Sequence, residues 1–250
     1  MRSRRGTSRI PPGRRAWLAW TLWGCGLAVI CPTIVAAREP PVAERALAFF
    51  ASLPRGDVAA ALRSRRPPPI SLDDRDRAVA SLPHHGVLRP SADENGKIAT
   101  LRRVLVFHER SIVVHVELID VAQAFVGLHA RSILLISRRA LLILSSAELQ
   151  ALVAHEIGHD YFWDEYQRAT DRNDARALRV VELKCDGIAA LTLVELGLDP
   201  RALTSAAGKL TWVNEKLGAT ANASGYPSLS ARERFVLAVL ALGAQDESSR

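Results

Sequence analysis

The chain has 250 residues, and its 48% hydrophobic content is enough for one or two domains with a real core. Its formal net charge of +7 would suit a nucleic acid or an anionic membrane. However, six arginines fall within residues 1–15, and from residue 38 onward 27 basic residues balance 26 acidic ones. The excess charge belongs to the N-terminal tail, and no nucleic-acid partner is expected.

Residues 1–37 are typical of an export signal or a membrane anchor. Residues 16–37 are uncharged, follow the basic stretch and end in Val35-Ala36-Ala37, small residues that a signal peptidase accepts. Arg14-Arg15 also resembles a twin-arginine signal. If uncleaved, residues 16–37 are long enough for an inner-membrane anchor, which would be the only membrane contact. The rest is expected outside the cytoplasm, in the periplasm.

Residues 38–97 are predicted to form a helical N-terminal segment without chemistry of its own. Apolar residues at helical spacing favour short amphipathic helices, which Pro67-Pro68-Pro69 interrupts. Residues 83–96 are expected to be loop, with the His84-His85 pair in solvent. Because Cys25 and Cys31 lie in the tail, the exported part keeps one cysteine, which excludes an intramolecular disulfide framework.

Residues 98–245 are predicted to form the main domain, an α+β fold with a small antiparallel or mixed sheet followed by helices. Four β-branched stretches are the expected strands. They are RRVLVFH (102–108), SIVVHVELI (111–119), AQAFVGL (122–128) and SILLIS (132–137). His108, His115 and His129 lie in or beside them, and each is interpreted as a hydrogen-bonded structural histidine.

After Leu144 the pattern becomes helical. Ser145 and Glu148 form a capping-box pair that opens the helix LQALVAHEIGHDYFW. A second helix is expected over 175–196, ending at Gly197, and a third after Asp199-Pro200. A last helix is expected to open at a second capping-box pair, Ser230 and Glu233.

The stretch HEIGH (155–159) predicts a metal site. His155 and His159 are four residues apart, so on a helix both imidazoles project from one face and fit two corners of a zinc tetrahedron. Glu156 lies 100° around the helix, beside the open side of the metal, where a general base is needed. The surrounding residues are apolar, and burying unpaired His and Glu there would be costly without a metal.

The second helix supplies candidates for a third ligand. Glu182 and Asp186 are also four residues apart, so they face one direction. We expect Glu182 to coordinate one Zn²⁺ per chain and Asp186 to accept a hydrogen bond from a ligand histidine. The alternative is a pair of solvated acids, with Glu165 as a fallback ligand. Cys185 is interpreted as a buried small hydrophobe, with a thiolate ligand as the alternative.

Several stretches in the same order resemble one family, the HtpX-like and CAAX-prenyl-protease-like zinc endopeptidases of the gluzincin group. The resemblance covers residues 104–240. It includes DVAQAFVGLHARSILLISRRALLIL (120–144), HEIGH, ELKCD, LGLDP (196–200) and YPSLSARERFVLAVL (226–240). It implies a zincin-like helical core and an edge strand that holds the substrate as an added strand. By this resemblance Val126, Gly127, Leu128 and His129 form that edge, or the adjacent 133–137 does.

The chain departs from the family pattern at two positions. Gln123 stands in place of an asparagine, and Tyr226 stands in place of a late histidine, followed by the matching Pro227 and Arg232. A phenol at 226 can still donate a hydrogen bond to an oxyanion, so Tyr226 and Arg232 are candidate catalytic residues. The change at 226 is equally consistent with a lost step.

These observations predict a zinc-dependent endopeptidase of the cell envelope that binds polypeptide in extended form, with a metal-activated water and Glu156 as general base. The main alternative is a weak or inactive peptidase-like chaperone or assembly factor. A further alternative is a structural metal module in which a fourth ligand, such as Tyr226, closes the site.

Overall fold

The computed structural model describes residues 41–54, 57–82, 88–218 and 225–244. The helices of these ranges are α1 Val42–Ala51, α2 Val58–Arg65, α3 Leu72–Ala80, α4 Ala92–Thr100, α5 Arg102–Phe107, α6 Arg138–Ile143, α7 Ser146–Tyr161, α8 Trp163–Asp171, α9 Ala175–Glu195, α10 Arg201–Lys216 and α11 Leu229–Ala244. The strands are β1 His115–Ile119, β2 Val126–His129 and β3 Ile133–Ser137. The described part is thus mainly helical with a small sheet, as the sequence predicts for its α+β class.

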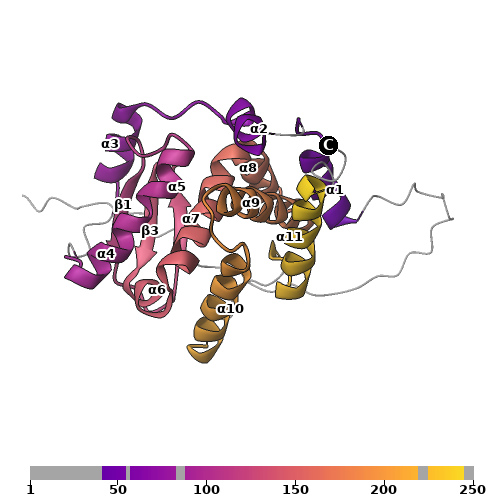
Figure 1. Cartoon of the computed structure of the whole chain (residues 1–250). Helices are drawn as coiled ribbons and strands as arrows, with labels where there is room; N and C mark the ends of the chain where they lie inside the picture. Colours follow the sequence, from indigo (N-terminus) through magenta and orange to yellow (C-terminus); the bar gives the residue numbers. More distant parts are fainter. Residues whose placement is uncertain (1–40, 55–56, 83–87, 219–224, 245–250) are drawn as a thin grey trace, which may run out of the picture. The chain divides into compact units, whose positions relative to one another are not determined.

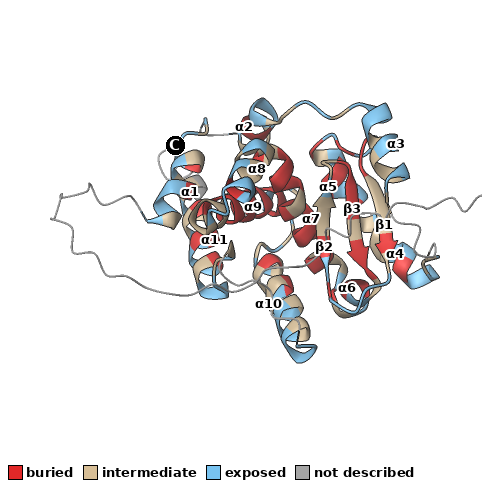
Figure 2. Ribbon diagram, turned by 180° about the vertical axis from the view of Figure 1, so that it is seen from behind, coloured by how far each residue is buried: buried red, intermediate tan, exposed pale blue. Residues whose placement is uncertain are grey.

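The three strands form one mixed sheet in the order β1-β3-β2. The central strand β3 runs parallel to β1 and antiparallel to β2, and its residues are buried on both faces of the sheet except for the partly exposed Leu135. The helix α7 lies between this sheet and the helices α9 and α11 (Figure 1). Burial is greatest along α7, α9 and β3, whereas α10 is mostly intermediate or exposed (Figure 2). One hydrophobic cluster packs α7 against the sheet and α9, and a second packs α9 against α1 and α11.

The predicted strand at 102–108 is wrong, because this stretch forms α5. Its buried residues are Leu101, Val104, Leu105 and His108, a spacing of three, four and seven that belongs to a helix. The β-branched content favours a strand. In a strand, however, the adjacent Arg102 and Arg103 would point to opposite faces, whereas in the helix both stay exposed. Burial on one helical face decides the local structure here.

Two element boundaries also differ from the prediction. The predicted loop at 83–96 is wrong in its second half, because α4 begins at Ala92 with a capping box between Ser91 and Glu94. The helix α11 begins at Leu229, and Ser228 Oγ accepts a hydrogen bond from Ala231 N at 3.2 Å, so the cap lies two residues before Ser230. The pair His84-His85 lies outside the described residues.

The two helices expected to carry the site follow the predicted boundaries closely. The capping box of Ser145 and Glu148 opens α7, and α9 ends just before Gly197, whose positive φ of 67° suits a residue without a Cβ. A Cβ built on Gly158 would lie 2.8 Å from the Cα of Cys185. Glycine at this position therefore allows α7 and α9 to approach each other closely.

His108 is a structural histidine, as predicted. Thr192 Oγ1 donates to Ile188 O at 2.7 Å, so it accepts from His108 Nε2 at 2.9 Å, and His108 Nδ1 accepts from the Tyr161 hydroxyl at 3.0 Å. Burial, with the positive charges of Arg66 and Arg110 nearby, lowers the pKa of His108 to about 3. The neutral ring thus joins α5, α7 and α9.

The proline-rich break is tied to the end of α7 through two arginines. Asp160 accepts from Arg110 Nε at 2.8 Å and from Arg131 Nε at 2.6 Å. The same guanidinium groups donate to the carbonyl oxygens of Pro67 and Pro68, at 2.6 and 2.9 Å. The helical N-terminal segment is therefore bonded to the helix that carries His155 and His159.

Among the described helices, none is long and apolar enough to cross a lipid bilayer. The predicted signal or anchor at 1–37 lies outside the described residues.

The contact between α7 and α9 gives a stability prediction. Gly158→Ala should lower the free energy of unfolding by about 1–3 kcal/mol, because the added methyl must push the backbone of Cys185 away. Gly96→Ala is the control, since a Cβ there meets nothing within 4 Å, and it should leave stability equal or up to about 1 kcal/mol higher. Chemical denaturation measures both, and equal stabilities would contradict the prediction.

Candidate metal centre

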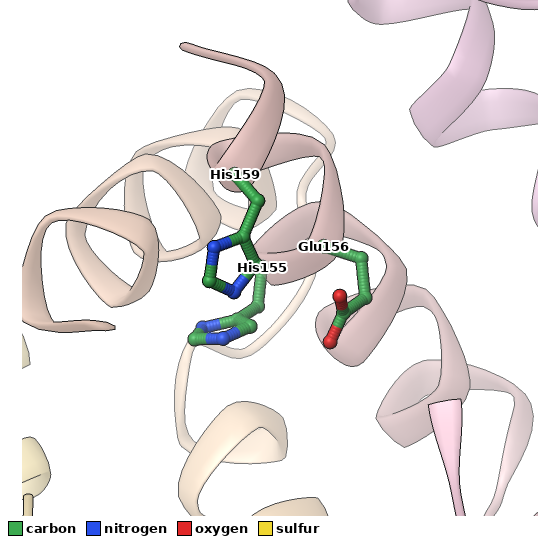
Figure 3. A group of neighbouring side chains, drawn as sticks. All are labelled: His155, Glu156 and His159. Carbon is green, nitrogen blue, oxygen red and sulfur yellow. The ribbon is translucent and has the colours of Figure 1, made fainter. Parts of the chain in front are cut away.

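The HEIGH stretch lies within α7, and its three polar side chains meet at one place. The possible ligand atoms of His155, Glu156 and His159 all lie within 4.8 Å of one another. The two imidazole rings sit on successive turns with their centroids 5.1 Å apart, and the Glu156 carboxylate lies beside them (Figure 3). Both histidines are buried, and Glu156 is partly exposed. The helix geometry thus gathers these groups.

The α9 helix brings Glu182 to the same two rings. Glu182 Oε2 lies 3.4 Å from His155 Nε2, and Glu182 Oε1 lies 3.6 Å from His159 Nε2. Zinc at about 2.0–2.2 Å from each ligand would place tetrahedral ligand atoms about 3.3–3.6 Å apart. Two nitrogens and a carboxylate therefore have the chemistry and the approximate spacing of three zinc ligands.

Asp186, one turn after Glu182, contacts the other nitrogen of His155. His155 Nδ1 and Asp186 Oδ1 are 2.8 Å apart, and Asp186 is fully buried. A carboxylate on Nδ1 orients the ring and leaves Nε2 directed toward Glu182. The alternative of two solvated acids is wrong, because Glu182 and Asp186 are both buried against His155.

Arg232 of α11 bridges the two acidic residues. Its Nη1 donates to Asp186 Oδ1 and its Nη2 donates to Glu182 Oε2, each at 2.9 Å. Burial disfavours the charged guanidinium, but Asp186 and Glu182 outweigh that effect and raise the pKa of Arg232. The residue that the family resemblance offered as a catalytic candidate thus holds two carboxylates in place.

The two histidines differ in protonation without a metal. Burial alone would lower the pKa of His155, but its hydrogen bonds to Asp186 and Glu182 raise it to about 10. Burial lowers the pKa of His159 to about 4, against the opposing charge of Glu182. Burial would raise the pKa of Glu182, but its bond to His155 and the nearby cations lower it to about 2. Without a metal, His155 carries the compensating positive charge.

These residues fit a divalent cation. With Arg232 and a charged His155, the carboxylates of Glu182 and Asp186 are already balanced, and a cation at Nε2 of His155 would take the place of that proton. Zinc would leave one excess positive charge, which an ionised Glu156 would neutralise. His159 Nδ1 and Asp186 Oδ2 have no hydrogen-bond partner among the described residues, so the pairing of polar groups around the site is incomplete.

Glu156 contacts the sheet. Its Oε2 accepts a hydrogen bond from the backbone N–H of Leu128 in β2 at 3.0 Å. Burial, opposed by His155 and reinforced by Glu182, raises the pKa of Glu156 to about 7. Of the two strands considered for the substrate edge, β3 is paired on both sides, so only β2 lies at an edge. The edge strand and the predicted base are therefore in direct contact.

Two tyrosines border this site. Tyr226 lies just before α11 and is 55% exposed, and burial of its hydroxyl beside Glu182 raises its pKa above the usual value. Tyr166 of α8 packs its ring against His159, with centroids 5.1 Å apart. Sequence reasoning missed Tyr166, and the only signal was its position seven residues after His159, across a break between helices.

The remaining candidates lie elsewhere or have other partners. Glu165, the fallback ligand, forms an ion pair with Lys184 at 2.7 Å. Cys185 is a free, fully buried thiol whose pKa burial raises, which agrees with a small hydrophobe. His115 Nε2 lies 3.0 Å from Glu117 Oε2, and His129 is exposed at the end of β2. None of these side chains joins the cluster around His155.

Comparisons with known proteins identify no relative of the chain. No protein-family model matches the chain, and neither the curated proteins nor the solved structures contain a match.

The bridge made by Arg232 gives a second stability prediction. Arg232→Met should destabilise the chelator-treated protein by about 3–5 kcal/mol, because it removes one of the two cations, Arg232 and the charged His155, that balance the buried Glu182 and Asp186. Arg234→Met, two residues along α11 at an exposed position, should change stability by less than about 0.5 kcal/mol. Denaturant titration compares them, and a loss below 1 kcal/mol for Arg232→Met would contradict the prediction.

Proposed function

We propose that the chain is a zinc-dependent endopeptidase. The observation that carries this proposal is the meeting of His155, His159 and Glu182 from two helices at 3.4–3.6 Å, with Glu156 beside them. A purely structural metal site needs no base at its open side, whereas Glu156 lies between the cluster and an edge strand. This combination favours hydrolysis over storage or structural binding of a metal.

In this proposal His155, His159 and Glu182 hold one zinc per chain. Bound zinc supplies a Lewis acid that polarises a peptide carbonyl and makes water a better nucleophile. Asp186 fixes the orientation of the His155 ring through Nδ1, and Arg232 keeps both carboxylates in position. Buried, paired charges of the chain thus hold the proposed ligands His155 and Glu182 in position.

Glu156 is the proposed general base. Its carboxylate can accept the proton of the attacking water and return it to the amine that leaves when the peptide bond breaks. The hydrogen bond from Leu128 N–H holds one carboxylate oxygen, Oε2, toward the strand and leaves Oε1 for this proton transfer. Tyr226 is the proposed donor of a hydrogen bond to the oxyanion, since its hydroxyl is near Glu182.

The proposed substrate is polypeptide in extended form. The short strand β2, Val126–His129, is an edge of the sheet and touches Glu156 through Leu128, so a peptide paired with it would pass the base. Recognition through backbone groups depends little on the substrate's sequence. With the predicted export segment at 1–37, the proposed substrates are proteins of the cell envelope.

Removal of the base tests the chemistry. Glu156→Gln should keep zinc but lower the rate of cleavage of an unfolded protein by a factor of about 10²–10⁴, because the carboxamide cannot take the proton. Cleavage by the zinc-loaded wild type, stopped by a chelator, is the reference. A Glu156→Gln protein that cleaves at the wild-type rate would refute the mechanism. A wild type that suppresses aggregation of the substrate without cleaving it would instead support a chaperone or assembly factor.

Metal analysis tests the ligands independently of activity. His155→Ala and His159→Ala should each reduce zinc from one per chain to a small fraction after dialysis, because two ligands hold zinc far more weakly than three. Glu165→Gln is the control, since Glu165 pairs with Lys184 away from the cluster, and it should keep one zinc. Elemental analysis decides, and full zinc content in either histidine variant would refute the assignment.

A further inference from the structure

Asn214 of α10 binds the backbone of the residue two positions before β2. Its Oδ1 accepts from Ala124 N at 2.8 Å, and its Nδ2 donates to Ala124 O at 3.0 Å. The carboxamide of Asn214 thus pairs with both the backbone N–H and the backbone C=O of Ala124, as a residue of a neighbouring antiparallel strand would. Residues 124 and 214 are 90 positions apart in the chain, so this is a tertiary contact.

The alternation of the strand shows which edge Asn214 occupies. Phe125 O accepts from Ser137 N at 2.8 Å, so residue 125 directs its backbone groups toward β3. Because successive residues of a strand direct these groups to opposite sides, residues 124, 126 and 128 direct theirs toward the open edge. Along this edge Asn214 holds Ala124 and Glu156 holds the N–H of Leu128. Val126 lies between the two contacts.

The helix that carries Asn214 is itself fixed to α7. Ser205 Oγ donates to Glu148 Oε1 at 2.7 Å, and Lys209 Nζ lies 2.8 Å from Glu148 Oε2. Glu148 also accepts from Ser145 N in the capping box of α7, at 2.8 Å. The helix α10 therefore links the N-terminal end of α7, the helix that carries Glu156, to the N-terminal end of the edge strand β2.

We propose that Asn214 is a positioning residue for the substrate strand. It holds β2 at the position where Leu128 reaches Glu156, and it occupies the edge groups of Ala124. A bound polypeptide would then pair with the edge at Val126 and with the carbonyl of Leu128, and would not extend to Ala124. The part of this proposal that concerns substrate rests on the proposed peptidase function. The part that concerns the strand does not.

Amide hydrogen exchange tests the strand directly. In zinc-loaded Asn214→Ala, the backbone amides of residues 124–128 should exchange at least tenfold faster than in the wild type, because two hydrogen bonds that order the strand are lost. Asn214→Asp keeps an acceptor for Ala124 N–H but loses the donor to Ala124 O, so its exchange should be intermediate. Asn95→Ala is the control, because the side chain of Asn95 in α4 donates to Pro90 O at 3.3 Å, away from β2. In this variant residues 124–128 should exchange as in the wild type.

Kinetics test the consequence for substrate. For an unfolded polypeptide, KM of Asn214→Ala should rise about tenfold, while zinc content stays at one per chain. Exchange within twofold of the wild type at residues 124–128 in both variants would overturn the positioning role, whatever the activity. If the wild type cleaves nothing, the peptidase proposal fails but the exchange result still decides the role of Asn214. Faster exchange with an unchanged KM would overturn the link between this strand and substrate.

Discussion

Two buried carboxylates, one turn apart on α9, govern the arrangement around them. Glu182 and Asp186 are 5% and 0% exposed, and a buried carboxylate without a positive partner costs several kcal/mol. Arg232 and His155 meet this demand with hydrogen bonds, so α11 and α7 are fixed to α9 by charge as well as by apolar packing. The proton on Nε2 of His155 faces Glu182 at 3.4 Å, and a divalent cation bound there would take the place of that proton.

Close helix packing makes this pairing possible. Gly158 allows the backbone of α7 to approach Cys185, and a Cβ on Gly187 would lie 2.2 Å from the Phe50 ring of α1. These two close contacts thus lie at Cys185 and Gly187, the residues directly before and after Asp186. The N-terminal helical segment supports the site here through Phe50 and at Asp160 through Arg110. This segment is therefore joined, directly or through Arg110, to residues that directly follow Asp186 and His159 in the chain.

Local patterns in the sequence predicted part of this structure. The boundaries of α7 and α9 follow from the capping box at Ser145 and from Gly197, because caps and breakers act within a few residues. The grouping of His155, Glu156 and His159 follows from helical spacing alone. The helix α5 was missed because β-branched content favoured a strand over the three- and four-residue spacing of its buried face. Which strand is the edge depends on pairing order, which local patterns do not contain.

Contacts made across long sequence separations were the hardest to predict. The spacing of Glu182 and Asp186 indicated that they share a face, but not that Arg232 bridges them, and the family resemblance alone drew attention to Arg232. Asn214 and Tyr166 gave no usable signal, because an Asn or a Tyr near a helix end is ordinary without knowledge of what it meets. Information of this kind enters only when packing places α10 against the sheet and α8 against His159.

The contact between Glu156 and Leu128 joins a residue placed by local helical spacing to a strand edge placed by long-range pairing. A carboxylate on a helix and a strand edge have no covalent reason to stay in register, since 28 residues separate Glu156 from Leu128. Register comes from the pairing of β2 with β3 and from a second path around the site, through Glu148, α10 and Asn214 to Ala124. The strand is thus held to α7 at two points, four residues apart along β2 and its approach. The ladder with β3 orders the strand on one side, and these two contacts hold its other edge beside the cluster of His155, His159 and Glu182.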